Sequence, residues 1–450
     1  MATNDHGPSL ASTLPLLAVL LTVGPASAQP GPVPAALDAD ARRAVVESAA
    51  QTLRERYIFP DVGERAAAAI EAALADGRYD ELEQPWAFAE RLTADLQAVA
   101  ADKHMRVSAP GPAPASAAAS APTTPPPRAE AGVARADRLA GDIGYIEIVA
   151  FPPRDTFKAP VDRAMAPLAD TRALIVDVRR NGGGDPMSVA YLVSYFLESE
   201  EPVHINSFIW RNPGTETYRT DEFWSTTTPF SYAGKPVYVL TSERTFSGGE
   251  EFAYDMQVMD LGVLVGETTG GGANPGGGAP LAAGLSMFVP GGRAENPITG
   301  TNWEGVGVVP DIETASTDAL KVALEQLGES PAATEIDALS VARVFEPRST
   351  PQPGSEAAVR RLSDELARGE PDYDLMAPGL ADATRTQLES LHQRFSELGP
   401  IRSVTFVEVD VMGGNVYDVE YENGSLRWVI ALGSDGKTVG AGFRPSAPPQ

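Results

Sequence analysis

The sequence predicts an α/β protein, in which a mixed-sheet core follows a small helical domain and precedes a small α+β domain. Residues 38 to about 100 are rich in Ala, Leu and Glu, and their apolar side chains recur at helical spacing. Strand-like runs such as "ALIVDVR" and "PVYVLTS" then alternate with amphipathic runs such as "EEFAYDMQVM", a pattern typical of an α/β core with partly parallel strands. Near the C-terminus, apolar residues alternate on both sides of "NG", which predicts an antiparallel hairpin or meander.

Breaks in composition set the expected domain limits. We expect the helical domain over 38–108 and the α/β core over 132–328. Residues 109–131 contain too much Pro and Ala to build a core, so they predict a flexible or extended linker that lets the helical domain be positioned separately. A Pro- and Ser-rich break precedes the last domain, expected over 355–446. Its alternating apolar residues are Tyr417, Val419, Tyr421, Leu426, Trp428, Ile430 and Leu432.

The first residues (1–28) resemble a signal peptide. "LPLLAVLLTVG" is apolar, and the Ala-Ser-Ala behind it is the small-residue pattern of a cleavage site after Ala28. The run is too short for a permanent span, so we expect a periplasmic or extracellular protein with no stable membrane span after cleavage. The residues before the run include no Lys or Arg, and an uncleaved apolar N-terminus stays open as the alternative.

The composition argues against several classes of function. The 450-residue chain carries 35 Lys and Arg against 61 Asp and Glu, and its net charge of -26 would repel a nucleic acid or an anionic membrane. It contains no cysteine, and therefore no thiol nucleophile, thiolate metal site or disulfide. A reaction that needs a proton acceptor at neutral pH must choose among four histidines. These are His6, which the signal peptide would remove, His104, His204 and His392.

"TFSGGEEFAY" (245–254) places Ser247 directly before an expected helix. The hydroxyl fits an ordinary N-cap, which accepts a backbone N–H of the first helical turn. It also fits a nucleophile, because the Gly248 N–H and the positive end of the helix dipole would face a developing oxyanion. "DVRRNGGGD" (177–185) follows a buried strand, and its glycines allow the backbone to approach a substrate and to present a second N–H.

Four ordered stretches carry a family resemblance: "IVDVRRNGGG", "TSERTFSGGEEFAY", "LVGETTGGG" and "NPITGTNWEGVGVVPD". Over roughly residues 40–328 the chain resembles the tail-specific or C-terminal-processing serine peptidases, in the branch that is similar to interphotoreceptor retinoid-binding protein and the tricorn core protease. The resemblance implies a ClpP/crotonase-like core, and we expect the last domain to be NTF2- or cystatin-like. It places the nucleophile at Ser247 and the oxyanion donors on the backbone of Gly183 and Gly248.

The resemblance also implies which residue accepts the serine proton. The bacterial processing peptidases carry a lysine in a "GKG" segment, but this chain reads "GETTGGGA" with Gly272 at that position, so a Ser–Lys pair is not expected. The tricorn-like branch takes its base from a histidine in the N-terminal helical part, which falls on His104. Its acidic partner falls on Glu304. Lys103 stands where that branch has a serine, so the orientation of His104 stays open.

The other polar residues have structural interpretations. We expect Asp177 and Arg179 to form an ion pair at a strand end, and Glu250 to accept backbone N–H groups in the first turn of its helix. We expect His204, in a strand-like run, and His392, in an amphipathic helix, to be structural as well. The sequence contains no HExxH motif, histidine pair or dense calcium loop, and "GGGANPGGG" lacks the residues of a P-loop, so no metal or cofactor is predicted.

Together these observations predict a secreted or periplasmic serine-type peptidase, which attacks a peptide or protein substrate through Ser247 with His104 as general base. Two alternatives stay open. One is a non-catalytic binding protein for an apolar ligand or peptide on the same scaffold, and the other has its functional end in the last domain. Either would leave Ser247 as a helix cap, His104 as a structural histidine and Glu304 as a solvated loop acid. The substrate and the oligomeric state are not predicted, and we find no clear PDZ-like segment.

Overall fold

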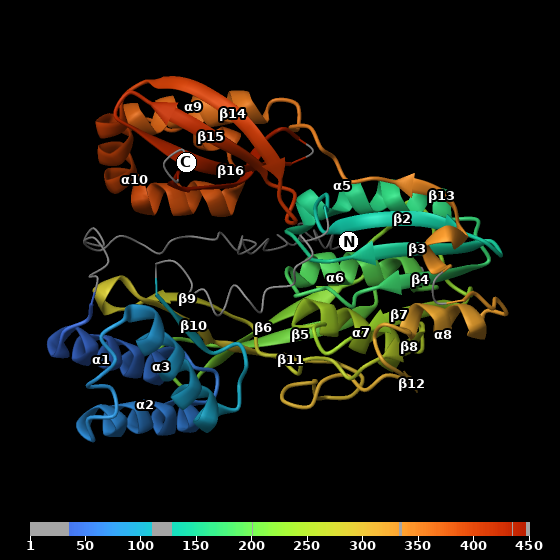
Figure 1. The fold of residues 1–450 in the computed structure, drawn as a ribbon, viewed down its shortest axis with the longest axis horizontal. Coiled ribbons are helices and arrows are strands. Elements are labelled where there is room, and N and C mark those ends of the chain that lie inside the picture. The colour runs from blue at the N-terminus through green and yellow to red at the C-terminus, as the bar shows by residue number, and fades with distance from the viewer. Residues whose placement is uncertain (1–35, 110–127, 200, 333–334, 434, 447–450) are drawn as a thin grey trace, which may run out of the picture. The chain divides into compact units, whose positions relative to one another are not determined.

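The computed structural model describes residues 36–109, 128–199, 201–332, 335–433 and 435–446 (Figure 1). Its described residues fall into two compact units, one within Val23–Pro351 and Phe406–Val416, the other within Gln352–Thr405 and Tyr417–Gln450. The expected signal peptide (1–28) and most of the expected linker (109–131) lie outside the described residues. Within the ranges that are described, every helix is too short or too polar to cross a membrane.

Three helices open the first unit: α1 (Ala39–Arg56), α2 (Pro60–Ala75) and α3 (Pro85–Ala100). Asp38 caps α1 by accepting the Ala41 N–H at 2.8 Å. Proline begins α2 and α3, where its missing N–H removes no helical hydrogen bond. The predicted helical spacing is confirmed, because one apolar face of these helices is buried. The predicted positions on that face are Val45, Ala49, Leu53, Phe88, Leu92 and Leu96.

The helical part is joined to the core by a shared sheet and a shared hydrophobic cluster. β1 (Arg106–Ser108) pairs antiparallel with β10 (Ser286–Pro290), which pairs with β9 (Gly276–Pro280). Three helices alone bury little apolar surface. The β9–β10 hairpin packs against their apolar face and shields it from solvent. Its buried residues in that cluster are Ala279, Leu281, Leu285, Met287 and Val289. The expectation that the helices are positioned separately is therefore wrong within this unit.

A seven-stranded mixed sheet forms the centre of the first unit, in the order β12-β8-β7-β4-β3-β2-β13. β3, β4, β7, β8 and β12 pair in parallel, whereas β2 pairs antiparallel with β3 and β13. This arrangement confirms the predicted mixed-sheet α/β core. The strands are β2 (Val133–Leu139), β3 (Ile143–Ile148), β4 (Ala173–Asp177), β7 (Val237–Thr241), β8 (Val263–Gly266), β12 (Ile312–Glu313) and β13 (Ser340–Phe345).

Helices cover both faces of this sheet. On one face lie α5 (Arg154–Met165), α6 (Pro186–Val193) and α7 (Gly248–Val258), and on the other lies α8 (Ala319–Gln326). Alternate residues of a strand point to opposite faces. Leu174 and Val176 of β4 therefore join the cluster with α5 to α7, and Ile175 joins the cluster with α8.

A smaller antiparallel sheet has the order β11-β5-β6. Its strands are β5 (His204–Arg211), β6 (Tyr218–Trp224) and β11 (Gly292–Glu295). Short 3-10 helices complete the first unit, namely η1 (Ala166–Leu168), η2 (Ser194–Phe196), η3 (Ala282–Gly284) and η4 (Ile336–Leu339).

The first unit extends past both expected limits of the core. Ala129 and Ala131, assigned to the linker from the sequence, are buried, and β13 lies beyond residue 328. Glu130 pairs with Arg163 of α5 at 2.7 Å and accepts the Arg348 N–H at 3.1 Å. These contacts connect α5 with Glu130, which precedes the expected start of the core at 132, and with Arg348, which follows its expected end at 328. A core that ends at Pro351 therefore describes the first unit better than one that ends at 328.

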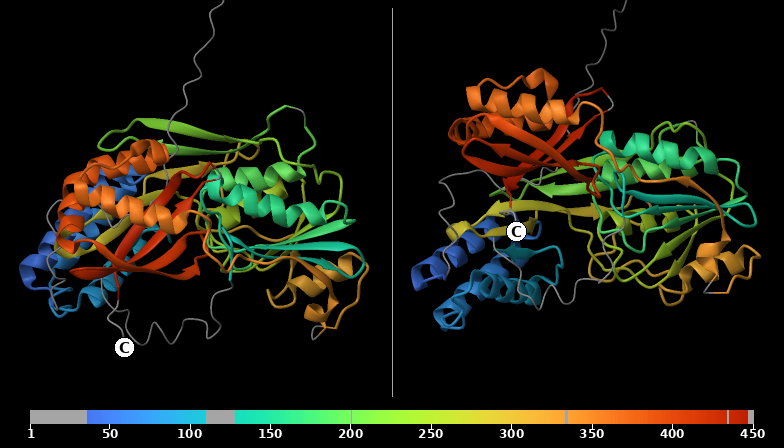
Figure 2. Two further views of the ribbon diagram at one scale, coloured as in Figure 1. Left: turned by 90° about the horizontal axis from the view of Figure 1, so that it is seen from above. Right: turned by 45° about the horizontal axis from the view of Figure 1, so that its top comes forward.

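The second unit is a small α+β domain, as predicted. Its sheet has the order β14-β15-β16-β17, and the two helices lie on one face of that sheet (Figure 2). The seven alternating apolar residues predicted to face a core are buried. The elements are α9 (Ser355–Arg368), η5 (Tyr373–Leu375), α10 (Pro378–Leu398), β14 (Ile401–Val409), β15 (Asn415–Tyr421), β16 (Gly424–Leu432) and β17 (Thr438–Pro445).

Candidate active site

Ser247 stands at the turn between β7 and α7 with an unusual backbone conformation. Its φ is 55° and its ψ is -121°, whereas an ordinary N-cap residue is extended with negative φ. A side-chain-bearing residue in such a region costs on the order of 1–3 kcal/mol, and strain of this kind clusters at functional sites. The strained conformation fits the nucleophile interpretation of Ser247, and the capping box that Ser247 forms with Glu250 fits the N-cap interpretation.

Glu250 holds this turn in place. Its fully buried carboxylate accepts the Ser247 N–H at 2.9 Å. It also accepts the Thr269 hydroxyl at 2.5 Å and the N–H groups of Gly271 and Gly272 at 2.6 and 2.8 Å. The expectation that Glu250 satisfies backbone donors is confirmed, but most of those donors come from the glycine-rich loop 269–274 and not from the first turn of α7.

The second glycine-rich segment packs directly against the turn at Ser247. A Cβ on Gly183 would lie 2.7 Å from Ser247 Cβ and would collide with it, whereas a Cβ on Gly248 would be tightly packed at 3.0 Å from Gly184 N. The Gly183 N–H donates to Asn181 Oδ1 at 2.8 Å and is thereby occupied. Within the described residues, Gly184 N and Gly248 N donate no hydrogen bond. Two unpaired N–H groups thus lie beside Ser247.

His104 lies between α3 and β1, close to the same turn. Its ring packs on Phe246, the residue before Ser247, with centroids 4.5 Å apart, and on Phe288 of β10 at 5.9 Å. The side chain is 12% exposed. Burial, and to a lesser extent the charge of Arg106, lowers the pKa of His104 to about 4. His104 is therefore neutral at physiological pH, with Nδ1 buried and making no hydrogen bond in the described part of the chain.

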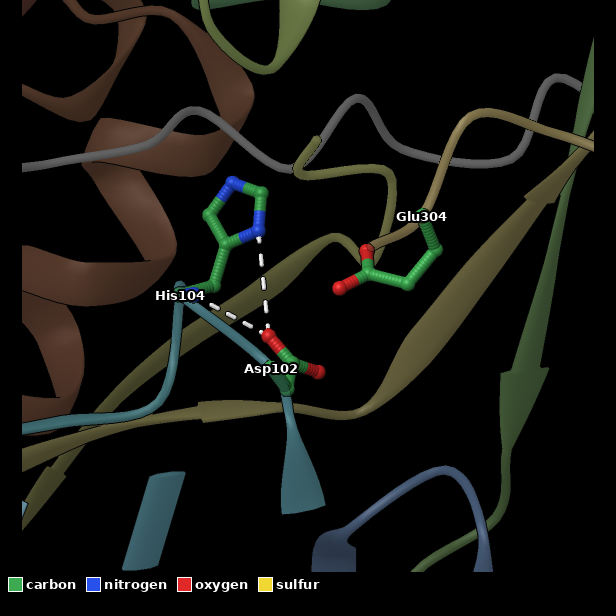
Figure 3. A group of neighbouring side chains, drawn as sticks. All are labelled: Asp102, His104 and Glu304. Atoms are coloured by element: carbon green, nitrogen blue, oxygen red, sulfur yellow. Dashed lines mark hydrogen bonds and ion pairs between the residues drawn. The ribbon is translucent and has the colours of Figure 1, made fainter. Parts of the chain in front are cut away.

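Two carboxylates face His104 (Figure 3). Asp102 Oδ1 accepts the backbone N–H of His104 at 3.0 Å and lies 4.0 Å from the ring Nδ1. Glu304 accepts the N–H groups of Ala273 and Asn274 at 2.5 and 3.1 Å through one oxygen, while its other oxygen is buried without a partner. The sequence analysis found Glu304 but missed Asp102, although Asp102 stands only two residues before the histidine in "ADKHMRV".

The proximity of the carboxylates perturbs their titration. Burial, followed by the charge of Asp102, raises the pKa of Glu304 to about 7. Burial also raises the pKa of Asp102, but hydrogen bonds from Asn274, His104 and Tyr57 oppose this shift by stabilising the ionised form. Asp102, His104 and Glu304 each offer a ligand atom, and these three atoms lie within 4.8 Å of one another. They are the one metal-compatible cluster of His, Asp and Glu among the described residues.

Two positions near His104 differ from the resembled peptidases. Gly272 stands where the bacterial processing peptidases have a lysine, and Lys103 stands where the tricorn-like branch has a serine. A Cβ on Gly272 would lie 2.3 Å from Phe246 Cζ and 2.7 Å from His104 Cε1, so a lysine at this position and the observed His104 position exclude each other. Lys103 donates to the Gly270 carbonyl at 2.5 Å and so ties the helical part to the glycine-rich loop. Among the described residues, its ammonium group makes no hydrogen bond to the His104 ring.

The remaining sequence-predicted residues make contacts of their own. Asp177 and Arg179 form the expected ion pair, with Nη2 and Oδ2 2.5 Å apart, and Tyr145 also donates to Asp177. His204 stacks on Trp224 with centroids 4.7 Å apart, in the sheet of β5 and β6. In the second unit, His392 Nδ1 lies 3.2 Å from the Leu366 carbonyl. These contacts suit the structural roles expected for both histidines, which stay a prediction.

Comparisons with known proteins agree with the sequence resemblance. Residues 142–314 match the model of Peptidase family S41, and residues 39–138 match the model of the N-terminal domain of Peptidase_S41 in eukaryotic IRBP. The chain is similar to a crystal structure of a candidate peptidase from Parabacteroides merdae (19% identity, 67% of this chain and 97% of that chain, TM-score 0.47). It is also similar to the photosystem II D1 C-terminal processing protease (13% identity, 61% and 93%, TM-score 0.40) and to the tricorn protease (25% identity, 44% and 18%, TM-score 0.29).

These structural likenesses are too distant to carry an argument by themselves, so the assignment rests on the two family models. The models match consecutive parts of the first unit and include the segments that hold Ser247, His104 and Glu304. The chain therefore belongs to peptidase family S41 and is a serine-type peptidase.

Proposed function

We propose that this peptidase hydrolyses peptide bonds through an acyl-enzyme on Ser247, with His104 as the general base and Glu304 as a neighbouring acid. The observation that carries the proposal is the strained turn at Ser247, which lies between two unpaired backbone N–H groups and beside a neutral, buried histidine. Such a combination supplies a nucleophile, a proton acceptor and an electrostatic site for the oxyanion.

The reaction begins when Ser247 Oγ attacks the carbonyl carbon of the scissile bond. The hydroxyl proton passes to His104 Nε2, and the carbonyl electron pair moves onto the oxygen. The imidazolium then returns this proton to the leaving amine, the C–N bond breaks, and a water molecule hydrolyses the acyl-enzyme by the same route. Because the His104 ring accepts no hydrogen bond from the Ser247 hydroxyl within the described residues, we expect this contact to form only when substrate is bound.

We assign the oxyanion site to the N–H groups of Gly248 and Gly184. The sequence prediction of Gly248 and Gly183 differs in the second donor. Support for Gly184 comes from the hydrogen bond between Gly183 N and Asn181 Oδ1, which engages the Gly183 donor, and from the position of Gly184 N beside Gly248. Both proposed donors lie next to Ser247. They would therefore be close to the carbonyl oxygen of the substrate under attack, on which the negative charge develops.

We further propose that the enzyme acts in the periplasm or outside the cell on a peptide or protein substrate. The apolar segment with a cleavage pattern after Ala28 supports export. The net charge of -26 argues against a nucleic acid as partner. The proposed mechanism uses side chains and backbone donors and needs no cofactor.

Covalent labelling with a fluorophosphonate, followed by peptide mapping, tests this proposal. We expect one labelled residue, Ser247, and parallel loss of labelling and peptide hydrolysis in Ser247→Ala, where loss of a nucleophile costs on the order of 10⁶-fold in kcat. Ser199→Ala is the matched control, because Ser199 is exposed and outside the cluster. A folded parent that neither reacts nor hydrolyses any peptide would instead support the alternative of a non-catalytic binding protein for an apolar ligand or peptide.

A further inference from the structure

We propose that the free edge of β9 (Gly276–Pro280) binds the substrate chain as an added β-strand, several residues away from the scissile bond. This inference rests on the proposed peptidase function and makes an extended, unfolded peptide segment the form of substrate that the enzyme takes. β9 stands at one end of the sheet order β1-β10-β9, so among the described strands it pairs only with β10 (Figure 1). Its other edge is the proposed binding surface.

The hydrogen bonds of the β9–β10 hairpin determine which groups of β9 face outward. At the turn, the Leu281 N–H donates to the Leu285 carbonyl at 2.8 Å. At the opposite end, the Gly291 N–H donates to the Pro275 carbonyl at 3.1 Å. In an antiparallel pair, residues that bond to the partner strand alternate with residues whose N–H and C=O groups point away from it. Both ends give the same alternation, in which the odd-numbered residues of β9 bond to β10 and the even-numbered residues face outward.

Gly276 and Gly278 therefore direct their N–H and C=O groups toward the free edge. Among the described residues, neither N–H has an acceptor and neither carbonyl has a donor. Pro280 adds one outward carbonyl but no N–H. Gly278 is exposed, and a Cβ placed on Gly277 or on Gly278 would meet no atom within 4 Å. These two residues point to opposite faces of the strand, so a peptide backbone has space to pair with β9 here.

The edge lacks the features that usually prevent strand addition. Natural edges are protected by charged side chains, proline, bulges or a covering segment. The residues "GGGAP" of β9 include no charge, and their register with β10 has no bulge. Proline is present only at the last position, where it ends the row of outward donors. A peptide that adds to such an edge is held by hydrogen bonds of its main chain.

A short segment links β9 to the proposed nucleophile. The N–H groups of Gly272 and Ser247 both donate to one oxygen of Glu250, Oε2, at 2.8 and 2.9 Å. From Gly272 the chain advances four residues to Gly276, and a chain of that length spans at most about 14 Å. Since an extended peptide rises about 3.3 Å per residue, about six residues are enough to span from Ser247 to the edge of β9.

The register also places this strand close to the proposed base. Gly278 lies opposite Phe288 of β10, in a pair without mutual hydrogen bonds, where Cα atoms are typically about 4.5 Å apart. The Phe288 ring stacks on the His104 ring with centroids 5.9 Å apart. One side chain, that of Phe288, thus separates β9 from His104. A substrate that extends from Ser247 past this ring comes to the free edge.

Gly278→Pro tests the edge, because proline removes the outward N–H and leaves the β9–β10 hydrogen bonds intact. The assay compares a long peptide, with about eight residues on each side of the scissile bond, and a short one, with about two. Both carry the sequence around a site that the parent cleaves in unfolded casein. Only the long peptide reaches β9. Its kcat/KM relative to the short peptide should therefore fall by about three- to tenfold, the usual effect of one lost hydrogen bond.

Thr220→Pro is the matched control on another edge strand. β6 is the edge of the sheet β11-β5-β6, and the Asn212 N–H donates to the Thr217 carbonyl at 2.9 Å. By the same alternation, the N–H of exposed Thr220 points outward. Thr220→Pro should keep the parent's ratio of the two kcat/KM values. If Gly278→Pro also keeps it, at an unchanged thermal midpoint, the proposal is overturned.

Gly278→Ala separates the hydrogen bond from the size of the added side chain. Alanine keeps the N–H, and its methyl group enters open space. We expect Gly278→Ala to lower the ratio less than Gly278→Pro does. An equal loss in the two variants would contradict a role for the outward N–H.

Amide hydrogen exchange, followed by NMR, tests strand addition without turnover. The protein is Ser247→Ala, and the probe is the peptide mixture from a tryptic digest of casein. We expect the peptides to slow exchange at Gly276 and Gly278 about tenfold or more, whereas Gly277, which bonds to β10, is already protected. Unchanged exchange at both residues would overturn the proposal. Protection without peptide that rises with protein concentration would show a second copy of the chain at this edge, and would overturn it as well.

The exchange experiment also distinguishes failure of this inference from failure of the proposed function. A parent that neither reacts with a fluorophosphonate nor hydrolyses peptides, but whose Gly276 and Gly278 amides become protected in Ser247→Ala, would remove the peptidase mechanism and leave a peptide-binding edge. A parent that reacts and hydrolyses, with no protection at either glycine, would remove the inference alone.

Discussion

Acid should inactivate this enzyme well below neutral pH. The sequence alone predicts a decline of kcat/KM near the ordinary imidazole pKa of about 6.5, because protonated imidazole cannot accept the serine proton. In the structure, Phe246 and Phe288 cover the His104 ring, and burial lowers its pKa to about 4. We therefore expect the titration of His104 to leave kcat/KM unchanged above about pH 5 and to lower it around pH 4.

Phe288→Ala tests the cause of this shift. A pKa of about 4 in place of about 6.5 corresponds to roughly 3 kcal/mol against the charged imidazole. At pH 5, a histidine with pKa 4 is about 90% neutral and one with pKa 6.5 is about 3% neutral, a difference of about thirtyfold in competent enzyme. Phe288 covers one side of the ring, so Phe288→Ala should shift the acid limb of kcat/KM to higher pH by about one to two units. At pH 5 the variant should therefore lose activity, but by no more than about thirtyfold.

The assay is the pH dependence of kcat/KM for a fluorogenic peptide at constant ionic strength. Activity regained after return to neutral pH controls for acid unfolding. Tyr218→Ala serves as the matched aromatic control, because Tyr218 of β6 is 47% exposed and should leave the profile unchanged. An acid limb near pH 6.5 in the parent, or superimposable profiles for the parent and Phe288→Ala, would refute the argument from burial.

Four other measurements test the remaining features. Burial raises the pKa of Glu251 to about 8, so its stabilisation is present below about pH 4.5 and is lost as the pH rises through 8; Glu251→Gln should flatten the thermal midpoint over this window, and an unchanged slope would argue against it. Gly272→Ala should sharply reduce hydrolysis, because its Cβ would meet Phe246 and His104, and near-parent activity would contradict that steric argument. A chain that ends at Pro351 should remain soluble and react with a fluorophosphonate, whereas one that ends at 328 lacks β13 and should aggregate in size-exclusion chromatography; equal behaviour of the two would show that β13 is dispensable. Zn²⁺ should inhibit reversibly, because the side chains of Figure 3 present three ligand atoms within 4.8 Å, and equal Zn²⁺ binding by the parent and Glu304→Gln would argue against binding at that cluster.

Local patterns predicted the elements well, because helical and strand periodicity depend on residues close in sequence. The alternation across "NG" located a sheet face on which Trp428 and Ile430 are buried. The spacing of Leu53 and Leu92 located helical faces. The same patterns did not predict that β1 pairs with β10, since that contact joins distant parts of the chain. As a result, the helical part was expected to be separate when it shares a sheet and a core with the β9–β10 hairpin.

The site was harder to predict where its geometry depends on hydrogen bonds. A run of glycines indicates close backbone approach but does not say which N–H is free, and here Asn181 occupies the Gly183 donor. Comparison with the tricorn-like pattern drew attention to Lys103, whose side chain binds a loop carbonyl. Asp102, one residue earlier, contacts His104 and was missed because its partners Tyr57 and Asn274 come from distant segments.

The glycine-rich loop 269–274 connects the nucleophile turn with both carboxylates of the cluster. Its N–H groups bind Glu250, which in turn binds the Ser247 N–H, and the following two N–H groups bind Glu304. The Asn274 side chain, at the end of the loop, binds Asp102. A displacement of this loop would therefore disturb the nucleophile turn and both carboxylates together, so its backbone position is a requirement of the site.

In the proposed mechanism, Gly272 explains why the base is a histidine and not a lysine. The loop brings Gly272 so close to Phe246 and His104 that even a methyl group would collide with both rings. A lysine at this position could act as base only if the His104 ring were absent or displaced. Conversely, when the segment between α3 and β1 carries His104, position 272 of the loop must be glycine to leave space for the imidazole ring. The proposed role of His104 as base therefore depends on two features, the pairing of β1 with β10, which positions the segment that carries His104, and the glycine at position 272, which leaves space for its ring.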